Sequence, residues 1–333
     1  MRGPRVVAGI AVATVVAGLG VALVARLWSG GAAAVGPIPA AAMAFPADAR
    51  LLAGVDLARL RESPLYERYA ARLAAALPGD VLGPLAGGTG ADPLRDLDRV
   101  LVAWLPGTGD GLHGLAHVRG RLGAVPDRLA AGGLTSRSRP GATTWALGEI
   151  RGVPAALALL DDGSALVGDT SAVEATLDSL SRGEAPLRGN AALLDLAGEL
   201  PAGGGSLWLV GDGALLAELG DALGSGSGLG LSLPPVAGIA ASAEPSPQIA
   251  IDVVALAHDE AGARRLADTV RGVLALASLQ AARIPELGEA ASAVSVATEA
   301  RRVRIGARLP LELFDGLGRL SGPAGPGPSG DAQ

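Results

Sequence analysis

Three arginines near the end of the chain are the residues whose spacing suggests chemistry most directly. Arg302, Arg304 and Arg308 alternate with apolar residues, and this period of two predicts a strand with guanidinium groups on one face. Guanidinium groups bind carboxylates and phosphates through paired N–H donors. The pattern predicts a surface for anions, lipid headgroups or an acidic partner, and the alternative is the solvated face of an antiparallel sheet. Arg137 and Arg139 indicate a similar face earlier in the chain.

The histidines do not predict a metal site. His113 and His117 have the H-x₃-H spacing that on a helix would place two imidazoles on one side. The nearby Gly111 and Gly114 favour a strand instead, in which residues four apart are roughly 13 Å apart. One ion cannot bridge that gap. His258 stands at a predicted strand end, where it has only weak support as a general base.

Several enzyme classes are excluded because the chain contains no lysine and no cysteine. It therefore has no P-loop lysine, no Schiff base, no thiol nucleophile and no iron–sulfur ligand. The run Gly224–Gly230 resembles a phosphate loop in composition only, and no G-x-S-x-G motif occurs. The net charge of −6 argues against nucleic acid as a partner. We predict no cofactor and no metal, and we identify no catalytic residue.

Alternating apolar residues and turn signals predict six strands in the first half of the chain. Asp162 and Gly163 supply the Asp-Gly signal of a tight hairpin turn between the last two. The six predicted strands cover residues 51–56, 100–105, 112–118, 143–150, 153–160 and 165–167.

Capping signals predict the helices that must pack against these strands. Ser63 followed by Pro64 begins one helix, and residues 126–131 form a short one. Ser171 and Glu174 fit a capping box for a third. The apolar face of this third helix consists of Val173, Leu177 and Leu180.

The second half repeats the same order of strand, helix, hairpin, helix, hairpin and helix. Its predicted strands are 206–210, 236–243, 249–257, 293–298 and 302–309, with helices at 191–200, 214–223 and 311–320. A further helix has an apolar stripe at Leu266, Val270, Val273, Leu274 and Ala277. We therefore predict a duplicated module in which the strands at Leu51, Val100 and Thr143 are equivalent to those at Leu207, Val236 and Ala293.

A run of twenty uncharged residues, Val6 to Ala25, is long enough to cross a bilayer as a helix. Arg2 and Arg5 precede it, which favours a cytoplasmic N-terminus. Residues 29–44 have the Gly, Ala and Pro content of a linker. This linker contains the A-x-A sequence Ala42-Met43-Ala44, so the alternative to a retained anchor is a signal peptide cleaved before Phe45.

Three short motifs follow the apolar run. They are Pro46-Ala47-Asp48-Ala49, Gly54-Val55-Asp56 and Ser63-Pro64-Leu65. Over about twenty residues, the chain resembles a group of uncharacterised bacterial envelope proteins. In these proteins the motifs P-x-D-A, G-V-D and S-P-L follow one another just after a membrane segment. The resemblance implies an anchored envelope protein and no known catalytic residue. Locally, Asp56 is a strand-end turn residue and Ser63 a helix N-cap.

The sequence thus predicts an α+β fold, with an N-terminal transmembrane helix followed by two similar modules of antiparallel sheet covered by helices. The predicted parts are an anchor at 1–28, a linker at 29–44, modules at 45–190 and 191–320, and a disordered tail at 321–333. We expect a single-pass protein of the bacterial inner membrane with a non-catalytic binding or scaffold module outside. Its partners are the bilayer, through residues 6–25, and another envelope protein or an anionic ligand. The alternatives are a hydrolase or transferase with a site between the modules, and a carrier of an apolar ligand.

Overall fold

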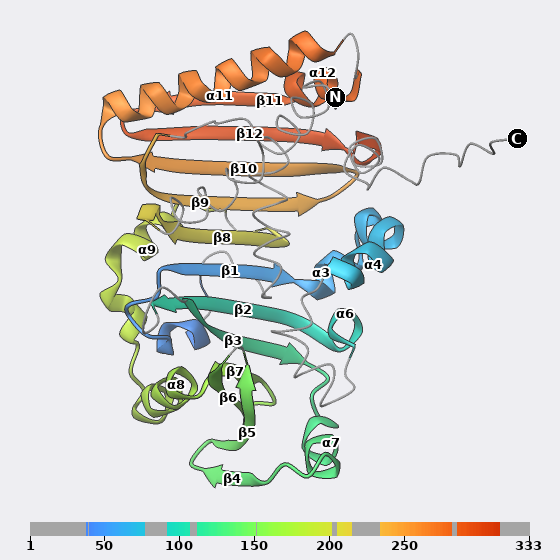
Figure 1. The fold of residues 1–333 in the computed structure, drawn as a ribbon, viewed down its shortest axis with the longest axis vertical. Coiled ribbons are helices and arrows are strands. Elements are labelled where there is room, and N and C mark those ends of the chain that lie inside the picture. The colour runs from blue at the N-terminus through green and yellow to red at the C-terminus, as the bar shows by residue number, and fades with distance from the viewer. Residues whose placement is uncertain are drawn as a thin grey trace, which may run out of the picture.

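A computed structural model describes residues 38, 40–76, 92–106, 112–150, 152–201, 205–214, 234–281 and 285–313. The described residues form one twelve-stranded antiparallel sheet with helices packed against it (Figure 1). The order of hydrogen-bonded strands is β11-β12-β10-β9-β8-β1-β2-β3-β7-β6-β5-β4. The prediction of a mixed helix and strand fold with antiparallel sheet is confirmed. Both halves of the chain share this single sheet, and each half contributes a contiguous block of strands to it.

The two halves meet at the centre of the sheet, where β1 (Leu51–Asp56) pairs with β8 (Leu207–Asp212). Ala53 lies opposite Leu209 in the middle of this antiparallel ladder. Nearly all residues of the two strands are buried. A strand that is covered on both faces needs consecutive apolar residues, which explains why these strands do not alternate. The hydrophobic core is therefore continuous from one half of the chain to the other.

From β1 outwards the first half adds six strands. The last two of them in chain order, β6 and β7, form the predicted hairpin, in which Gly163 has a positive φ of 79°. The six strands are β2 (Leu97–Pro106), β3 (Leu112–Gly120), β7 (Ala165–Asp169), β6 (Val153–Leu160), β5 (Ala142–Ile150) and β4 (Ser136–Arg139).

From β8 outwards the second half adds four strands. They are β9 (Val236–Pro245), β10 (Gln248–Ala257), β12 (Arg302–Pro310) and β11 (Val294–Glu299). The long helix α11 (Glu260–Gln280) lies along the β11 end of the sheet and contacts α12 (Pro285–Ser292) (Figure 1). Leu266 and Val270 of α11 pack against β10 and β12. The first part of the predicted apolar stripe thus faces the sheet, and Val273 and Ala277 pack against Ala291 of α12.

The helical segments that precede β8 pack around the centre of the sheet and its lower part in Figure 1. In the hydrophobic core, Leu193 and Leu196 of α9 lie in the same cluster as Trp208 and Val210 of β8. The helical segments are η3 (Ala40–Ala44), α3 (Leu57–Arg61), α4 (Pro64–Ala76), α6 (Pro93–Asp96), α7 (Val125–Ala131), α8 (Thr170–Arg182), η4 (Pro186–Gly189) and α9 (Ala191–Ala197).

The strand order is the same in both directions from the centre. It is β1-β2-β3-β7-β6 in the first half and β8-β9-β10-β12-β11 in the second. Each half also has a bulge at the second residue of its second strand. The register skips Asp98 between the pairs Leu97–Gly120 and Arg99–Arg119. It skips Ala237 between the pairs Val236–Ala257 and Gly238–Leu256.

This order corrects one predicted equivalence. The strand at Thr143 is β5, which has no counterpart among the described strands of the second half, whereas β6 takes the place of β11. The hairpin β4–β5 extends the sheet only on the first side. Turn and strand patterns identified β5 correctly, but they carry no information about which strand lies beside which.

Two local expectations about α8 were wrong. Its N-cap is Asp169, whose carboxylate accepts hydrogen bonds from the backbone N–H groups of Ser171 and Ala172, so Ser171 does not begin a capping box. The side chain of Asp169 reaches these donors because the strand β7 ends at that residue. Leu180, predicted on the apolar face, is 37% exposed, whereas Val173 and Leu177 are buried.

The end of the predicted linker belongs to the folded core. Ile38, Ala42 and Ala44 are buried, and Phe45 is fully buried beside them. Within the described ranges, no helix has both the length and the apolar content needed to cross a bilayer. The apolar run at 6–25, the predicted helix after residue 214, the loop at 224–230 and the tail at 321–333 all lie outside those ranges, wholly or almost wholly.

Candidate functional site

The three predicted arginines lie on β12 and each has a carboxylate partner in the chain. Arg302 Nε donates to Glu199 Oε1 at 2.6 Å, and Arg304 Nη2 donates to Glu199 Oε2 at 2.7 Å. Arg308 Nη1 lies 3.4 Å from Asp252 Oδ2 of β10. The three arginine side chains remain about half exposed, at 44%, 46% and 55%. The structure therefore places them together on one strand face, with part of their surface still facing solvent.

Glu199 joins the segment between the two halves to the outer part of the second half. It comes just after α9, whose Leu193 and Leu196 pack in the core, and its own side chain is only 18% exposed. Burial opposes ionisation of this carboxyl, but the hydrogen bonds and charges of Arg302 and Arg304 outweigh burial and lower its pKa. Glu199 is therefore ionised at neutral pH and occupies a position that an external anion would otherwise take.

The other predicted arginine pair lies at the opposite edge of the sheet. Arg137 and Arg139 belong to the edge strand β4, and Arg139 Nη2 donates to Asp178 Oδ1 of α8 at 2.6 Å. Nine strands lie between β4 and β12 in the sheet order, so the arginines of β4 and those of β12 do not form one surface.

His113 and His117 both lie on β3, as predicted. His117 is buried, and its Nε2 lies 3.0 Å from Ser164 Oγ in the turn between β6 and β7. Ser164 Oγ donates to Asp162 Oδ1 at 2.5 Å, which leaves its lone pairs to accept from His117 Nε2–H. Burial lowers the pKa of His117 and Arg119 lowers it further, against the opposing effect of Asp162. His117 is therefore held as a neutral imidazole.

The His117, Ser164 and Asp162 cluster is not arranged for nucleophilic catalysis. In a serine hydrolase the histidine stands between serine and carboxylate and removes the serine proton. Here the serine stands in the middle, and Ser164 has no exposed surface. Among the described residues, no group of three or more His, Asp or Glu side chains could hold a metal ion. His258 is exposed at the end of β10, and its carbonyl oxygen accepts from Arg301 Nη1 at 3.4 Å.

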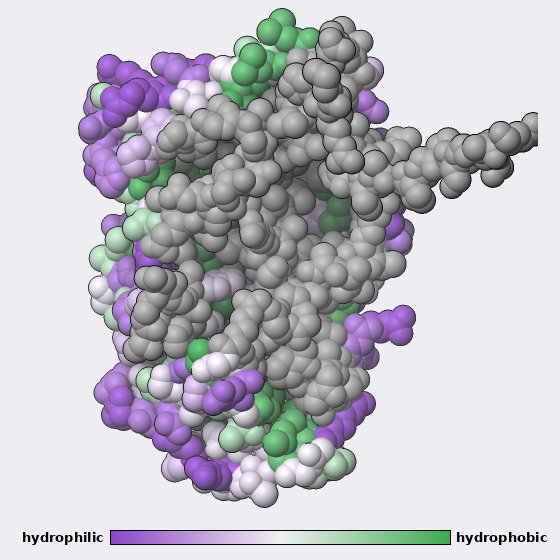
Figure 2. Space-filling view, viewed as in Figure 1, coloured by the Kyte–Doolittle hydropathy of each residue, from purple (hydrophilic) through white to green (hydrophobic). Residues whose placement is uncertain are grey.

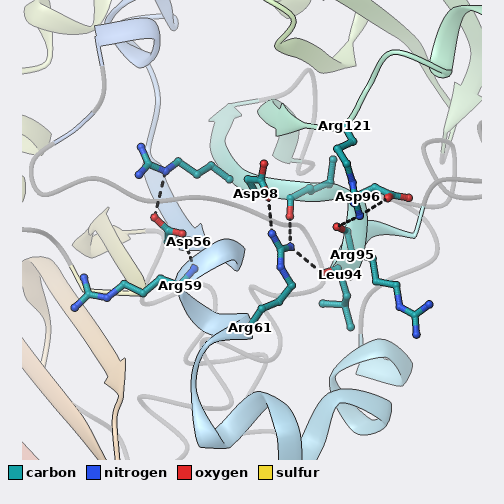
Figure 3. A network of polar contacts seen from close by, with 10 residues as sticks. Asp56, Arg59, Arg61, Leu94, Arg95, Asp96, Asp98 and Arg121 are labelled. Atoms are coloured by element: carbon teal, nitrogen blue, oxygen red, sulfur yellow. Dashed lines mark hydrogen bonds and ion pairs between the residues drawn. The ribbon is translucent and has the colours of Figure 1, made fainter.

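Sequence reasoning missed a polar network at the end of β1 and the start of β2 (Figure 3). Asp56 caps α3 by accepting from the backbone N–H of Arg59 at 2.9 Å, and its second oxygen accepts from Arg99 Nε at 3.2 Å. Arg59 Nε in turn lies 3.2 Å from Glu244 of β9. Asp56 is thus the predicted strand-end residue, with an additional role in holding β2 and α3 together.

Arg61 extends this network towards α6 (Figure 3). Its Nη1 donates to the carbonyl oxygens of Leu94 and Leu97 at 3.0 and 2.6 Å, and its Nη2 donates to Asp98 at 2.5 Å. Five donors on one planar group allow a single arginine to hold several acceptors. The dense charge in residues 92–99 was the available signal, although spacing alone does not connect those residues to Arg61. These contacts hold α3 against α6 and the start of β2.

At the predicted junction between the modules, the described residues form a closed apolar seam. Leu51, Leu52 and Leu209 are at most 2% exposed, and Val210 is fully buried. Among the described residues, no cluster of Asp, His and Ser side chains lies on this ladder. No protein-family model, curated protein or solved structure matches the chain.

Proposed function

We propose that this protein is a single-pass membrane protein of the bacterial cell envelope whose extracytoplasmic part is a non-catalytic binding or scaffold module. The apolar run at 6–25 anchors it in the inner membrane, and Arg2 and Arg5 keep the N-terminus in the cytoplasm. The closed seam between β1 and β8 is the observation that carries the non-catalytic assignment. An enzyme site between the halves would need polar side chains in the place that these buried leucines fill.

The module is the product of a duplication. The repeated strand order and the bulge at the second residue of both β2 and β9 support this. The central ladder is compatible with it, as any antiparallel ladder is, because exchanging the two strands maps its pairs onto one another. If Leu51 corresponds to Leu207, the pair Leu51–Gly211 becomes Val55–Leu207, and Ala53–Leu209 becomes itself. The flanking hydrogen bonds follow the same rule. The N–H of Asp56 donates to the carbonyl of Ser206 at 2.8 Å, and that of Asp212 to the carbonyl of Arg50 at 2.9 Å.

The anchor is retained in the mature protein. Cleavage before Phe45 would remove Ile38, Ala42 and Ala44, which are buried in the same core as Phe45. Loss of three core residues would leave space that the remaining side chains cannot fill without cost. N-terminal sequencing of the protein from washed membranes tests this point, and a sequence beginning at Phe45 would contradict it.

The binding surface is the arginine face of β12, and its partner is an anionic ligand or an acidic envelope protein. Arg302, Arg304 and Arg308 still expose about half of their side chains after pairing with Glu199 and Asp252. A guanidinium with one carboxylate partner keeps further N–H donors for a second acceptor.

A pull-down from solubilised membranes tests the module and its surface together. The bait is the full chain, compared with a variant in which Arg302, Arg304 and Arg308 are all replaced by Gln. A control carries Arg182→Gln. Arg182 is as exposed as Arg308, but it lies at the end of α8, away from β12, and pairs with Glu184. A partner that the wild type and control retain and the triple variant loses supports the assignment. Equal retention by all three would contradict it.

A further inference from the structure

The last two turns of α11 carry an apolar surface that no described element covers. Leu276 and Leu279 are 57% and 75% exposed, the highest values among the large hydrophobic residues of the described ranges. Figure 2 shows hydrophobic residues along this end of the molecule, at the top of the view. Monomeric soluble proteins expose single leucines often, but two neighbouring ones on the same helical face form a patch.

The sequence of α11 changes character along its length. The exposed side of its first half is charged, with Arg264, Arg265 and Arg271 against Glu260 and Asp268. No charged residue occurs between Arg271 and Arg283. The exposed side of this segment is uncharged and mostly apolar, and a helix with apolar residues on more than one side is normally covered by other elements.

The inner side of this segment is covered by the protein itself. Val273 and Ala277 are buried against Ala291 of α12. Leu276 and Leu279 point away from that contact, because they lie on the side of the helix where Ala275 and Gly272 are also exposed. The amphipathic pattern therefore has a second apolar face, for which the chain supplies no described partner.

We infer that this end of α11 rests on the surface of the lipid bilayer. The inference depends on the proposed membrane anchor. Only residues 26–37 separate the apolar run from Ile38, which is buried in the core. Twelve residues span at most about 42 Å when fully extended, so the module cannot move far from the membrane.

The charges that flank the patch in sequence fit a lipid surface. Arg271 precedes the patch and Arg283 follows it, with no acidic residue between them. Helices that lie in the membrane interface bury leucines by roughly 5–10 Å and keep arginines at the headgroups. Leu276 and Leu279 supply the apolar part of such a contact and the arginines supply the charged part.

Fluorescence quenching in vesicles tests the contact, and the absence of native cysteine makes site-specific labelling simple. The full chain carries Ala275→Cys with a fluorescent label and is reconstituted in phosphatidylcholine and phosphatidylglycerol vesicles. Part of the lipid carries a nitroxide at the headgroup. The matched control is Ala175→Cys, an exposed alanine on α8. We expect strong quenching at position 275 and little at position 175.

A second variant shows whether the leucines cause the contact. In the Ala275→Cys chain, Leu276→Ser together with Leu279→Ser should abolish quenching while the protein still floats with the vesicles. Equal quenching at positions 275 and 175 in a floating chain would overturn the lipid contact and leave the anchor standing. A chain that does not float at all would overturn both. In detergent, the label should be equally accessible to a soluble quencher at every protein concentration. If its accessibility falls as the protein concentration rises, the patch contacts a second copy of the chain, and the inference is overturned.

Discussion

The indole ring of Trp208 lies over Gly54, directly across the ladder that joins β8 to β1. A Cβ atom on Gly54 would come within 2.3 Å of both Cε2 and Nε1 of the indole, whose residue is 3% exposed. Nε1 has no hydrogen-bond partner among the described residues. Packing on glycine, and not a polar contact, therefore holds this ring at the centre of the sheet.

Gly54→Ala should lower the free energy of unfolding by about 1–3 kcal/mol, because the indole must move out of a closely packed site. Urea unfolding measures the change. The control is Gly114→Ala on β3, where a Cβ would meet nothing within 4 Å. In a Trp208→Leu background the cost of Gly54→Ala should shrink, since the clashing ring is absent. Equal costs at Gly54 and Gly114 would contradict the packing argument.

Acid should destabilise the protein through His117 before any carboxylate contributes. The pKa of this imidazole is lowered in the folded state, so the unfolded chain binds more protons once the pH falls below about 6.5. The free energy of unfolding should therefore decrease from pH 7.5 downwards and level off below the folded pKa.

Urea unfolding at pH 7.5 and pH 5.5 checks this dependence, with His117→Gln as the comparison. Glutamine can donate to Ser164 but does not titrate. The pKa values of Asp162 and Glu199 are also lowered, so their stabilising effect is lost only in stronger acid, below about pH 4.5. If the free energy of unfolding of the variant falls between pH 7.5 and pH 5.5 by as much as that of the wild type, another group is responsible.

Glu199→Gln should destabilise the protein by about 0.5–1.5 kcal/mol, because one charge-assisted contact with each of Arg302 and Arg304 is weakened. The matched control is Glu184→Gln, whose carboxylate pairs with Arg182 and is 49% exposed. That change should cost less, because solvent screens an exposed ion pair. Thermal unfolding at low and high salt provides the measurement, and high salt should reduce the difference. A larger effect at Glu184 would be the opposite of the expected order.

Val15→Arg should impair membrane insertion by roughly 2.5–3.5 kcal/mol, since the charge would lie near the bilayer centre. The fraction of the full chain recovered in membranes after a carbonate wash should fall. Val15→Leu keeps the run apolar and should leave recovery unchanged. Recovery of the arginine variant at the wild-type level would count against a spanning segment.

Local features of this protein follow from its sequence. Strand β6 has the predicted bounds, Val153–Leu160, because apolar residues lie between two turn signals there. The Asp-Gly turn after it, the N-terminal boundary of α4 at Pro64 and the buried stripe of α11 also depend on residues only a few positions apart. Asp169, not Ser171, is the N-cap of α8. Both residue types are common N-caps, so the short-range pattern alone does not choose between them.

Only the tertiary structure decided how these elements meet. Nothing in residues 51–56 or 207–212 specifies that β1 and β8 pair with each other, because any two buried apolar strands have similar patterns. The contact of Glu199 with Arg302 joins residues 103 positions apart. That contact gives two arginines of β12 a carboxylate partner within the chain, so that only their remaining N–H donors face solvent. Such pairings depend on the packing of the whole core, which selects among many strand orders that the local sequence permits equally well.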